Sequence, residues 1–244
     1  PVNSTQYFLT GGQDDGNQQT MAGNIHWGPG IEVTNVNDPS DGVFAQLLHT
    51  FEWNGGFVFD RMYVHGNPTP QRWGNVGNPS WSLNGTNVAI RDSFMDNMTN
   101  WNTDPHEAPG ATLERGPGAT TLYNNRFEGA GILVHWDASG DTLRLRGDCS
   151  TIRNYFYASQ TWMHGSPTSD GFYYGMRQPL EYKACWRAYT GGNIFDTSWN
   201  EITPASVFLA CTAVGEGGAQ GESVTDFEVD DNIFKHGPGV TNFC

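Results

Sequence analysis

A short phrase recurs six times along the chain and constrains the fold more than any other feature. In each phrase, a β-prone run leads into a polar turn and then an aromatic residue. The six aromatic residues are Tyr63, Phe94, Phe127, Phe156, Phe195 and Phe234. Asn or Asp stands two residues before the aromatic in five phrases, whereas the first has Arg61 there and Asp60 one residue earlier. The mean spacing is about 34 residues, and periods of roughly 20 to 50 residues are typical of stacked-repeat proteins.

Each repeat is predicted to contain short β-strands. Residues 57–59, 120–123 and 131–136 are rich in β-branched and aromatic side chains, and Gly, Asn, Asp and Pro separate such runs. No stretch carries a capped apolar stripe with helical spacing. One coil of this length leaves its apolar face open, so coils must stack and align like side chains in ladders. We therefore expect an all-β fold with an internal aromatic stack and an Asn hydrogen-bond ladder.

The order of these elements resembles that of a known architecture. Residues 57–66 and 83–93 are similar to the corresponding runs of an uncharacterised group of secreted bacterial β-helix proteins. From about residue 31 to 238 the chain resembles the right-handed parallel β-helix proteins, which include pectate lyases and polygalacturonases. The resemblance implies a right-handed parallel β-helix, or solenoid, of about six to seven coils with loop excursions. It says little about activity, because this fold hosts enzymes, adhesins and structural proteins.

The chain is expected to divide near residue 31. Residues 31–244 would form the β-helix, whereas residues 1–30 depart from the repeat pattern. A terminal segment of this kind either caps the open end of its own solenoid or adds as a strand to a neighbouring subunit. Both alternatives fit the sequence.

The acidic composition restricts partners and location. The formal net charge is −14 and the pI is near 4.6, which argues against nucleic acid or an anionic membrane as a partner. No 18-residue apolar run is present, so we expect no membrane insertion. The chain begins with Pro1 and has two lysines, Lys183 and Lys235. We interpret these features as those of a secreted protein, extracellular or at the cell surface, whose leader has been removed.

Four cysteines allow three disulfide pairings. Cys149 and Cys185 lie about one repeat apart, as do Cys211 and Cys244. Residues one repeat apart stack at a distance that a disulfide can span, so we favour these two bridges, with Cys185–Cys211 as the alternative. Disulfides are typical of oxidising compartments.

Two further groups of residues are candidate surface sites. Candidate glycosylation sites are the sequon asparagines Asn3, Asn84 and Asn97. The tryptophans that fall in predicted loops are Trp73, Trp81, Trp101 and Trp162. Exposed indoles could stack on sugar rings, but packing within loops or contacts between subunits explain them equally simply.

No catalytic constellation is predicted, so the sequence does not favour an enzyme. Lyase chemistry needs carboxylates that hold Ca²⁺ and a basic residue that removes a proton. The residues of these types near the repeat phrases are Asp60, Asp92, Asp96, Arg61, Arg91, Lys183 and Arg187. Each has a simpler interpretation as a turn or paired residue. Hydrolases that resemble polygalacturonase use an Arg-x-Lys motif and a paired Asp-Asp. This sequence has no Arg-x-Lys, and its Asp230-Asp231 pair belongs to the repeat phrase. His65 and His135 are the best histidines for acid–base work, although a lone His on a strand is usually structural.

Two hypotheses follow. The first is a secreted structural β-helix that associates with copies of itself into an extracellular fibre or surface layer, since the ends of a solenoid invite stacking. It needs no cofactor or metal. The second is a carbohydrate-active protein, either a polysaccharide lyase or hydrolase or a glycan-binding module, with Ca²⁺ required only for the lyase. The sequence favours the first.

Overall fold

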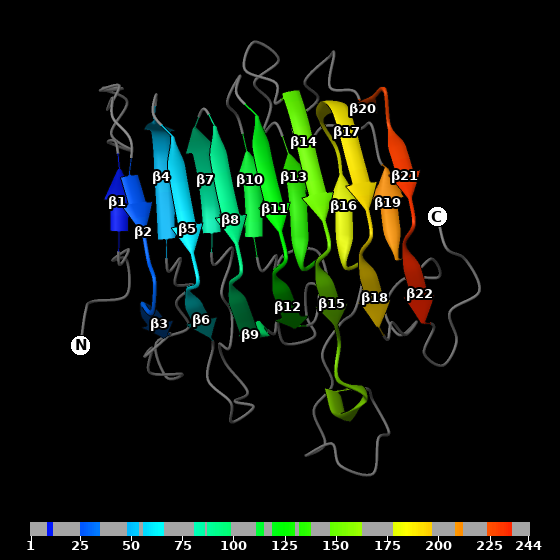
Figure 1. The fold of residues 1–244 in the computed structure, drawn as a ribbon, viewed down its shortest axis with the longest axis horizontal. Helices are drawn as coiled ribbons and strands as arrows, with labels where there is room; N and C mark the ends of the chain where they lie inside the picture. Colours follow the sequence, from blue (N-terminus) through cyan, green and yellow to red (C-terminus); the bar gives the residue numbers. More distant parts are fainter. Residues whose placement is uncertain are drawn as a thin grey trace.

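The protein is an all-β stack of three parallel sheets (Figure 1). The computed structural model describes residues 9–11, 25–34, 48–53, 56–65, 81–85, 87–98, 111–114, 119–129, 132–137, 147–162, 178–196, 208–211 and 224–235. Every pairing between strands in this part of the chain is parallel, and partners are three or four places apart in strand order. The chain thus visits the three sheets in turn, and we call each such turn a rung. This arrangement is compatible with a β-solenoid.

The first two sheets run the length of the stack. Sheet A contains, in order, β1 (Leu9–Gly11), β4 (Leu48–Trp53), β7 (Trp81–Gly85), β10 (Ala111–Glu114), β13 (Val134–Asp137), β16 (Leu180–Tyr182) and β19 (Leu209–Cys211). Sheet B contains β2 (Ile25–Trp27), β5 (Phe57–Asp60), β8 (Val88–Arg91), β11 (Thr120–Tyr123), β14 (Gly147–Ile152), β17 (Cys185–Gly191) and β20 (Val224–Thr225), with β21 (Glu228–Asp230) also pairing with β17.

Sheet C completes each rung. It contains β3 (Glu32–Thr34), β6 (Tyr63–His65), β9 (Phe94–Met98), β12 (Arg126–Gly129), β15 (Tyr155–Tyr157), β18 (Ile194–Asp196) and β22 (Ile233–Lys235). A 3-10 turn, η2 (Gln160–Trp162), follows β15. Two strands before residue 31, β1 and β2, pair with β4 and β5 of their own chain, so they belong to the same sheets as the strands that follow.

The bend between sheets B and C explains the repeat phrase. One residue in each bend has a positive φ: Arg61, Asp92, Asn124, Arg153, Gly192 and Asp231. The following residues are Met62, Ser93, Asn125, Asn154, Asn193 and Asn232, and they form one column. In this column each of the last three Asn side chains accepts, through Oδ1, the main-chain N–H of the preceding rung's Asn at 2.8 to 2.9 Å. The expected Asn ladder is therefore confirmed in the last four phrases.

The predicted aromatic stack is confirmed in the same four phrases, but the prediction was wrong for the first two. Phe127, Phe156, Phe195 and Phe234 stack in series. In the preceding rungs, however, Phe127 is in register with Met95 and then Val64, whereas Tyr63 and Phe94 are in register with Arg126 on the outer face. A shift of one residue moves a strand side chain to the opposite face. Alignment by the aromatic residue thus put Arg61 and Asp92 at the ladder position, which Met62 and Ser93 occupy in the structure.

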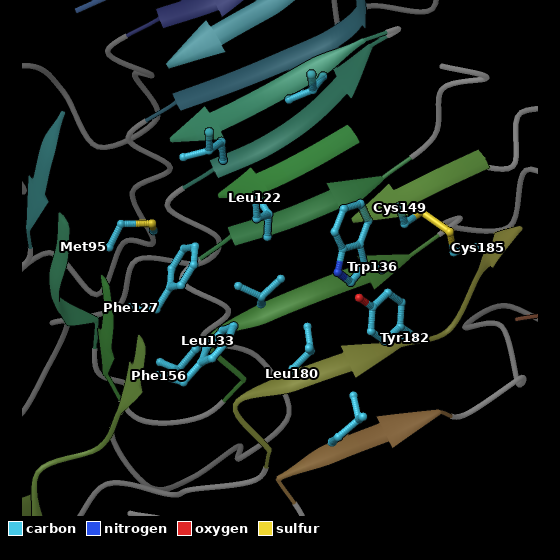
Figure 2. Close-up of a cluster of buried hydrophobic side chains, with 14 of the residues drawn as sticks. Met95, Leu122, Phe127, Leu133, Trp136, Cys149, Phe156, Leu180, Tyr182 and Cys185 are labelled. Atoms are coloured by element: carbon cyan, nitrogen blue, oxygen red, sulfur yellow. A yellow bond between two sulfur atoms is a disulfide. The ribbon is translucent and has the colours of Figure 1, made fainter. Parts of the chain in front are cut away.

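The core lies between the sheets and is built from aligned apolar side chains. Figure 2 shows Trp136 of sheet A stacked on Tyr182 of the next rung, with ring centroids 5.6 Å apart. The buried Tyr182 hydroxyl is satisfied by Thr151 at 2.8 Å and Thr190 at 2.9 Å, both from sheet B. Burial raises the pKa of Tyr182 far above its ordinary value. This phenol therefore stays neutral and links two sheets through the core.

One disulfide staples two neighbouring rungs. Cys149 of β14 is bonded to Cys185, the first residue of β17 (Figure 2), which confirms the first favoured bridge and removes Cys185–Cys211. Cys211 ends β19 and is exposed. Cys244 lies outside the described residues, so the second bridge remains a prediction.

Candidate functional site

A core position is exposed in the last rung that the structure describes. Phe59, Ile90, Leu122, Thr151, Thr190 and Val229 form one column of sheet B in successive rungs. The first five are 0% exposed, whereas Val229 is 44% exposed. All six occupy equivalent positions, so the exposure of Val229 reflects the end of the stack. We call residues 224–235, which hold β20, β21 and β22, the terminal rung.

Other core residues of the terminal rung are also partly exposed. Phe227 and Phe234 pack against the core but are only partly buried. Asn232 ends the Asn ladder, because its Oδ1 accepts from Asn193 but no described rung follows to supply an acceptor for its own N–H. At the other end of the stack, Trp27 and Ile31 of the first rung, which holds β1 to β3, are also partly buried apolar residues. Both ends thus present core side chains beside strand edges that have no partner in the described part of the chain.

The terminal rung is rimmed by acidic side chains. Its exposed carboxylates are Asp226, Glu228, Asp230 and Asp231. Its one cation, Lys235, is hydrogen-bonded to Asp196 of the preceding rung at 3.1 Å. Arg187 of β17 binds Asp148 through two hydrogen bonds of 2.5 and 2.9 Å. The charge of Arg187 also interacts with that of Asp226, but the four carboxylates leave an excess of negative charge around this apolar end.

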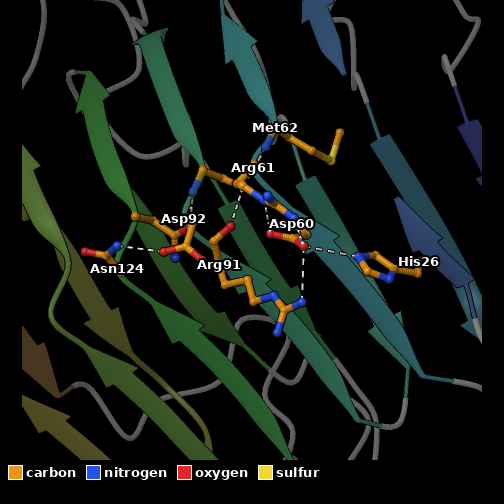
Figure 3. A network of polar contacts seen from close by, with 9 residues as sticks. His26, Asp60, Arg61, Met62, Arg91, Asp92 and Asn124 are labelled. Carbon is orange, nitrogen blue, oxygen red and sulfur yellow. Dashed lines mark hydrogen bonds and ion pairs between the residues drawn. The ribbon is translucent and has the colours of Figure 1, made fainter. Parts of the chain in front are cut away.

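A second polar cluster surrounds Asp60 (Figure 3). Its carboxylate is buried and accepts hydrogen bonds from Arg61 Nε and one Arg61 terminal nitrogen, both at 3.0 Å. Arg91 adds a third at 3.1 Å, and His26 Nε2 lies 3.4 Å away. The Arg61 guanidinium, aided by Arg91 and opposed by burial, holds the pKa of Asp60 well below its ordinary value. Guanidinium groups thus satisfy the Asp60 carboxylate with three hydrogen bonds, and this arrangement indicates a structural role.

Of the remaining residues considered for lyase chemistry, Asp92 lies beside the Asp60 network and the other three lie elsewhere on the stack. Asp92 accepts from Asn124 at 2.6 Å in the next bend, and Asp96 accepts from Tyr63 at 3.3 Å on sheet C. Lys183 is buried after β16, and Arg187 is paired as described. Asp96, Lys183 and Arg187 do not converge with Asp60 on one site. Asp92, in contrast, belongs to the network of Figure 3, because its charge joins that of Asp60 in raising the pKa of Arg61. Within the described residues, no group of three or more His, Cys, Asp or Glu side chains is arranged to hold a metal.

The two candidate histidines differ in their surroundings. His65 Nε2 lies 3.0 Å from Glu32 Oε1 at the exposed surface of sheet C. His135 Nε2 lies 3.8 Å from Glu181 Oε2, and both side chains are buried. Glu181 is in register with His135 in the adjacent strand of sheet A. Sequence reasoning missed Glu181, and its position between Leu180 and Tyr182 was the only available signal.

Aromatic side chains also line the outer face of sheet C. Tyr63 stacks on Phe94 with centroids 5.3 Å apart, and the Arg126 guanidinium lies 5.1 Å from the Phe94 centroid and 5.3 Å from that of Tyr155. These ring faces are covered by neighbours along the stack. They therefore offer poor platforms for a sugar, and the row is best explained as a packing ladder.

The predicted surface residues are only partly described. Trp81 and Asn84 lie in β7, Asn97 in β9 and Trp162 in η2, so Trp81 belongs to a strand and the prediction of a loop there was wrong. Trp73, Trp101 and Asn3 lie outside the described residues. Trp186 of β17, which is exposed, was not singled out from the sequence. Sugar stacking and glycosylation stay predictions.

Comparisons with known proteins give no family for this chain: no protein-family model, curated protein or solved structure matches it. In the described part of the chain, no helix has the length and apolar character needed to cross a membrane.

Proposed function

We propose that this chain is a right-handed parallel β-helix of about six to seven coils that serves as a secreted structural protein and assembles end to end. The single observation that carries the proposal is the exposure of Val229 in a column whose other members are wholly buried. Burial of apolar surface contributes about 25 cal/mol per Å², so covering this end is favourable. The disulfide supports an extracellular or cell-surface location.

The occupant proposed for the terminal rung is the first rung of a second copy. Each end of the stack offers one strand of every sheet, β1 to β3 at the start and β19, β21 and β22 at the other end. Continuing the columns would set Trp27 of the second copy on Val229 and its Val33 on Phe234. A head-to-tail contact of this kind does not close on itself and generates filaments. Strand pairing across the junction would be β-augmentation.

A matched pair of variants tests the proposal. Val229→Glu puts a carboxylate into the junction, and burying an unpaired charge costs several kcal/mol. Val58→Glu makes the same change on the outer face of β5, in the second rung and outside the core. Electron microscopy and sedimentation velocity should show filaments for the natural chain and Val58→Glu, and single particles for Val229→Glu. Normal assembly of Val229→Glu, or loss of assembly in Val58→Glu, would contradict end-to-end stacking.

One observation favours a second candidate, a carbohydrate-active protein. The buried His135–Glu181 pair joins an imidazole and a carboxylate on adjacent strands, and such a pair can hold or move a proton. Neutral polysaccharides are the preferred substrates, because the net charge of −14 disfavours polyanions. Release of reducing ends from a polysaccharide panel, lost in a folded His135→Gln variant, is the expected result. No binding and no cleavage, with or without Ca²⁺, would remove this candidate.

A further inference from the structure

The terminal rung combines an attractive feature with a repulsive one. Val229, Phe227 and Phe234 leave core surface uncovered, whereas Asp226, Glu228, Asp230 and Asp231 surround it with negative charge. We propose that these four carboxylates, the acidic rim, regulate end-to-end stacking by opposing it at low ionic strength. This inference rests on the proposed function, whose docking surface it shares.

The cations near the acidic rim compensate it only in part. On the preceding rung, Arg187 is hydrogen-bonded to Asp148, and its charge also interacts with that of Asp226 in the rim. One rung earlier, Arg153 donates to the Tyr123 hydroxyl at 3.1 Å. Lys235 is hydrogen-bonded to Asp196. The hydrogen bonds of Arg187 and Lys235 thus go to Asp148 and Asp196 and not to a rim carboxylate.

The incoming first rung would not supply the missing positive charge. Its described ionisable residues are His26 and Glu32. His26 continues the column of Glu228, but it lies 3.4 Å from Asp60 of its own chain. Glu32 continues the column of Ile233 and adds another carboxylate to the junction. Like charges brought together across an interface disfavour association.

Charge at exposed strand edges is a known means of preventing edge-to-edge association. The repulsion between exposed charges falls with added salt, because the Debye length shortens from about 20 Å at about 20 mM salt to about 4 Å at about 500 mM. The apolar contribution of Val229 does not weaken in the same way. Added salt should therefore allow the terminal rung to associate with the first rung of another copy.

The backbone supplies a matched experiment. Asp226 and Asp231 of the rim are exposed and have φ values of 50° and 49°. Asp148 and Asp92 are exposed residues of inner rungs in the same two columns, with φ values of 54° and 51°. Asn tolerates this conformation well. Asp148 is ion-paired with Arg187, so the second column gives the matched pair. The rim variant is Asp231→Asn and the control is Asp92→Asn, in which an amide oxygen can still accept from Asn124.

Sedimentation velocity over a range of protein and NaCl concentrations gives the association midpoint of each chain. At about 20 mM NaCl, the rim variant should associate at a protein concentration about tenfold lower than the natural chain and the control, which corresponds to about 1.4 kcal/mol. At about 500 mM NaCl the three midpoints should converge. Identical midpoints for the rim variant and the control at every salt concentration would overturn the inference and leave stacking intact. Absence of association in all three chains at every salt concentration would overturn the proposed function as well.

Discussion

Asn154 accepts two hydrogen bonds from Asn125 through one oxygen. Its Oδ1 lies 2.9 Å from the Asn125 main-chain nitrogen and 3.0 Å from the Asn125 side-chain amide nitrogen. Its own amide donates to the Leu122 carbonyl at 3.0 Å. One side chain thus satisfies buried groups of the preceding rung that water does not reach.

Asn154→Ala should therefore destabilise the stack strongly. The change leaves the Asn125 N–H and the Leu122 carbonyl with fewer partners, and an unsatisfied buried group costs roughly 1–3 kcal/mol. We expect the free energy of unfolding to fall by about 2–4 kcal/mol, measured by urea denaturation. Asn124→Gly, an exposed position with a φ of 53°, should cost less than about 1 kcal/mol. Equal losses at the two positions would show that the ladder does not carry this stability.

Removal of the Cys149–Cys185 disulfide should also lower stability. The bridge closes a loop with a sequence separation of 36, and the chain-entropy relation gives about 4 kcal/mol for a loop of that length. Cys149→Ala/Cys185→Ala, compared with the natural chain in urea, should show a loss of about 2–4 kcal/mol. Because the variant lacks this bridge, reductant should not lower its stability further by breaking it. A variant as stable as the natural chain would mean that rung stacking alone restrains this region.

Tyr155 should ionise at unusually high pH. Burial, together with a hydrogen bond of 2.5 Å from its hydroxyl to Asp196 and the charge of that carboxylate, raises its pKa to about 12. The folded-state pKa lies above the unfolded value, so its contribution to stability is complete below about pH 10 and is lost as pH rises through about 12. Ultraviolet titration of the natural chain and of Asp196→Asn should show one phenol titrating at lower pH in the variant. Superimposable curves would contradict the coupling.

Two neighbouring glycines should respond differently to the same substitution. Gly28 has a φ of 127°, and a Cβ there would lie 1.8 Å from the Asp60 carbonyl oxygen. Gly30 has a φ of 80°, and a Cβ there would meet nothing within 4 Å. Gly28→Ala should displace the first rung from β5, whereas Gly30→Ala should cost only about 1–2 kcal/mol of backbone strain. Hydrogen exchange of β2 measures both, and similar protection in the two variants would refute the steric argument.

Several features could be predicted because they are repeated. Asn125, Asn154, Asn193 and Asn232 recur with Phe two residues later, and one period of strand, bend and strand explains both ladders. The cysteine spacing indicated Cys149–Cys185 for the same reason, since residues one rung apart meet. When a local pattern repeats, equivalent residues one period apart are expected to meet in neighbouring rungs. A residue that does not repeat gives no such information about its long-range contacts.

Other features depended on register, which sequence periodicity did not resolve. Tyr63 and Phe94 match the repeat phrase by eye, yet the positive-φ residues Arg61 and Asp92 set the register and turn both rings outward. The pairing of His135 with Glu181 likewise required the alignment of β13 with β16.

The sequence by itself thus determined that this chain stacks short parallel strands with an Asn ladder, because side chains with a fixed period must align when coils pile up. Only the tertiary structure decided which residues face inward in each rung, and that Val229 marks the end of the core. A valine at the last rung has the same local sequence signals as one inside the stack. Its exposure depends on whether another rung covers it, and that is a property of the assembled fold.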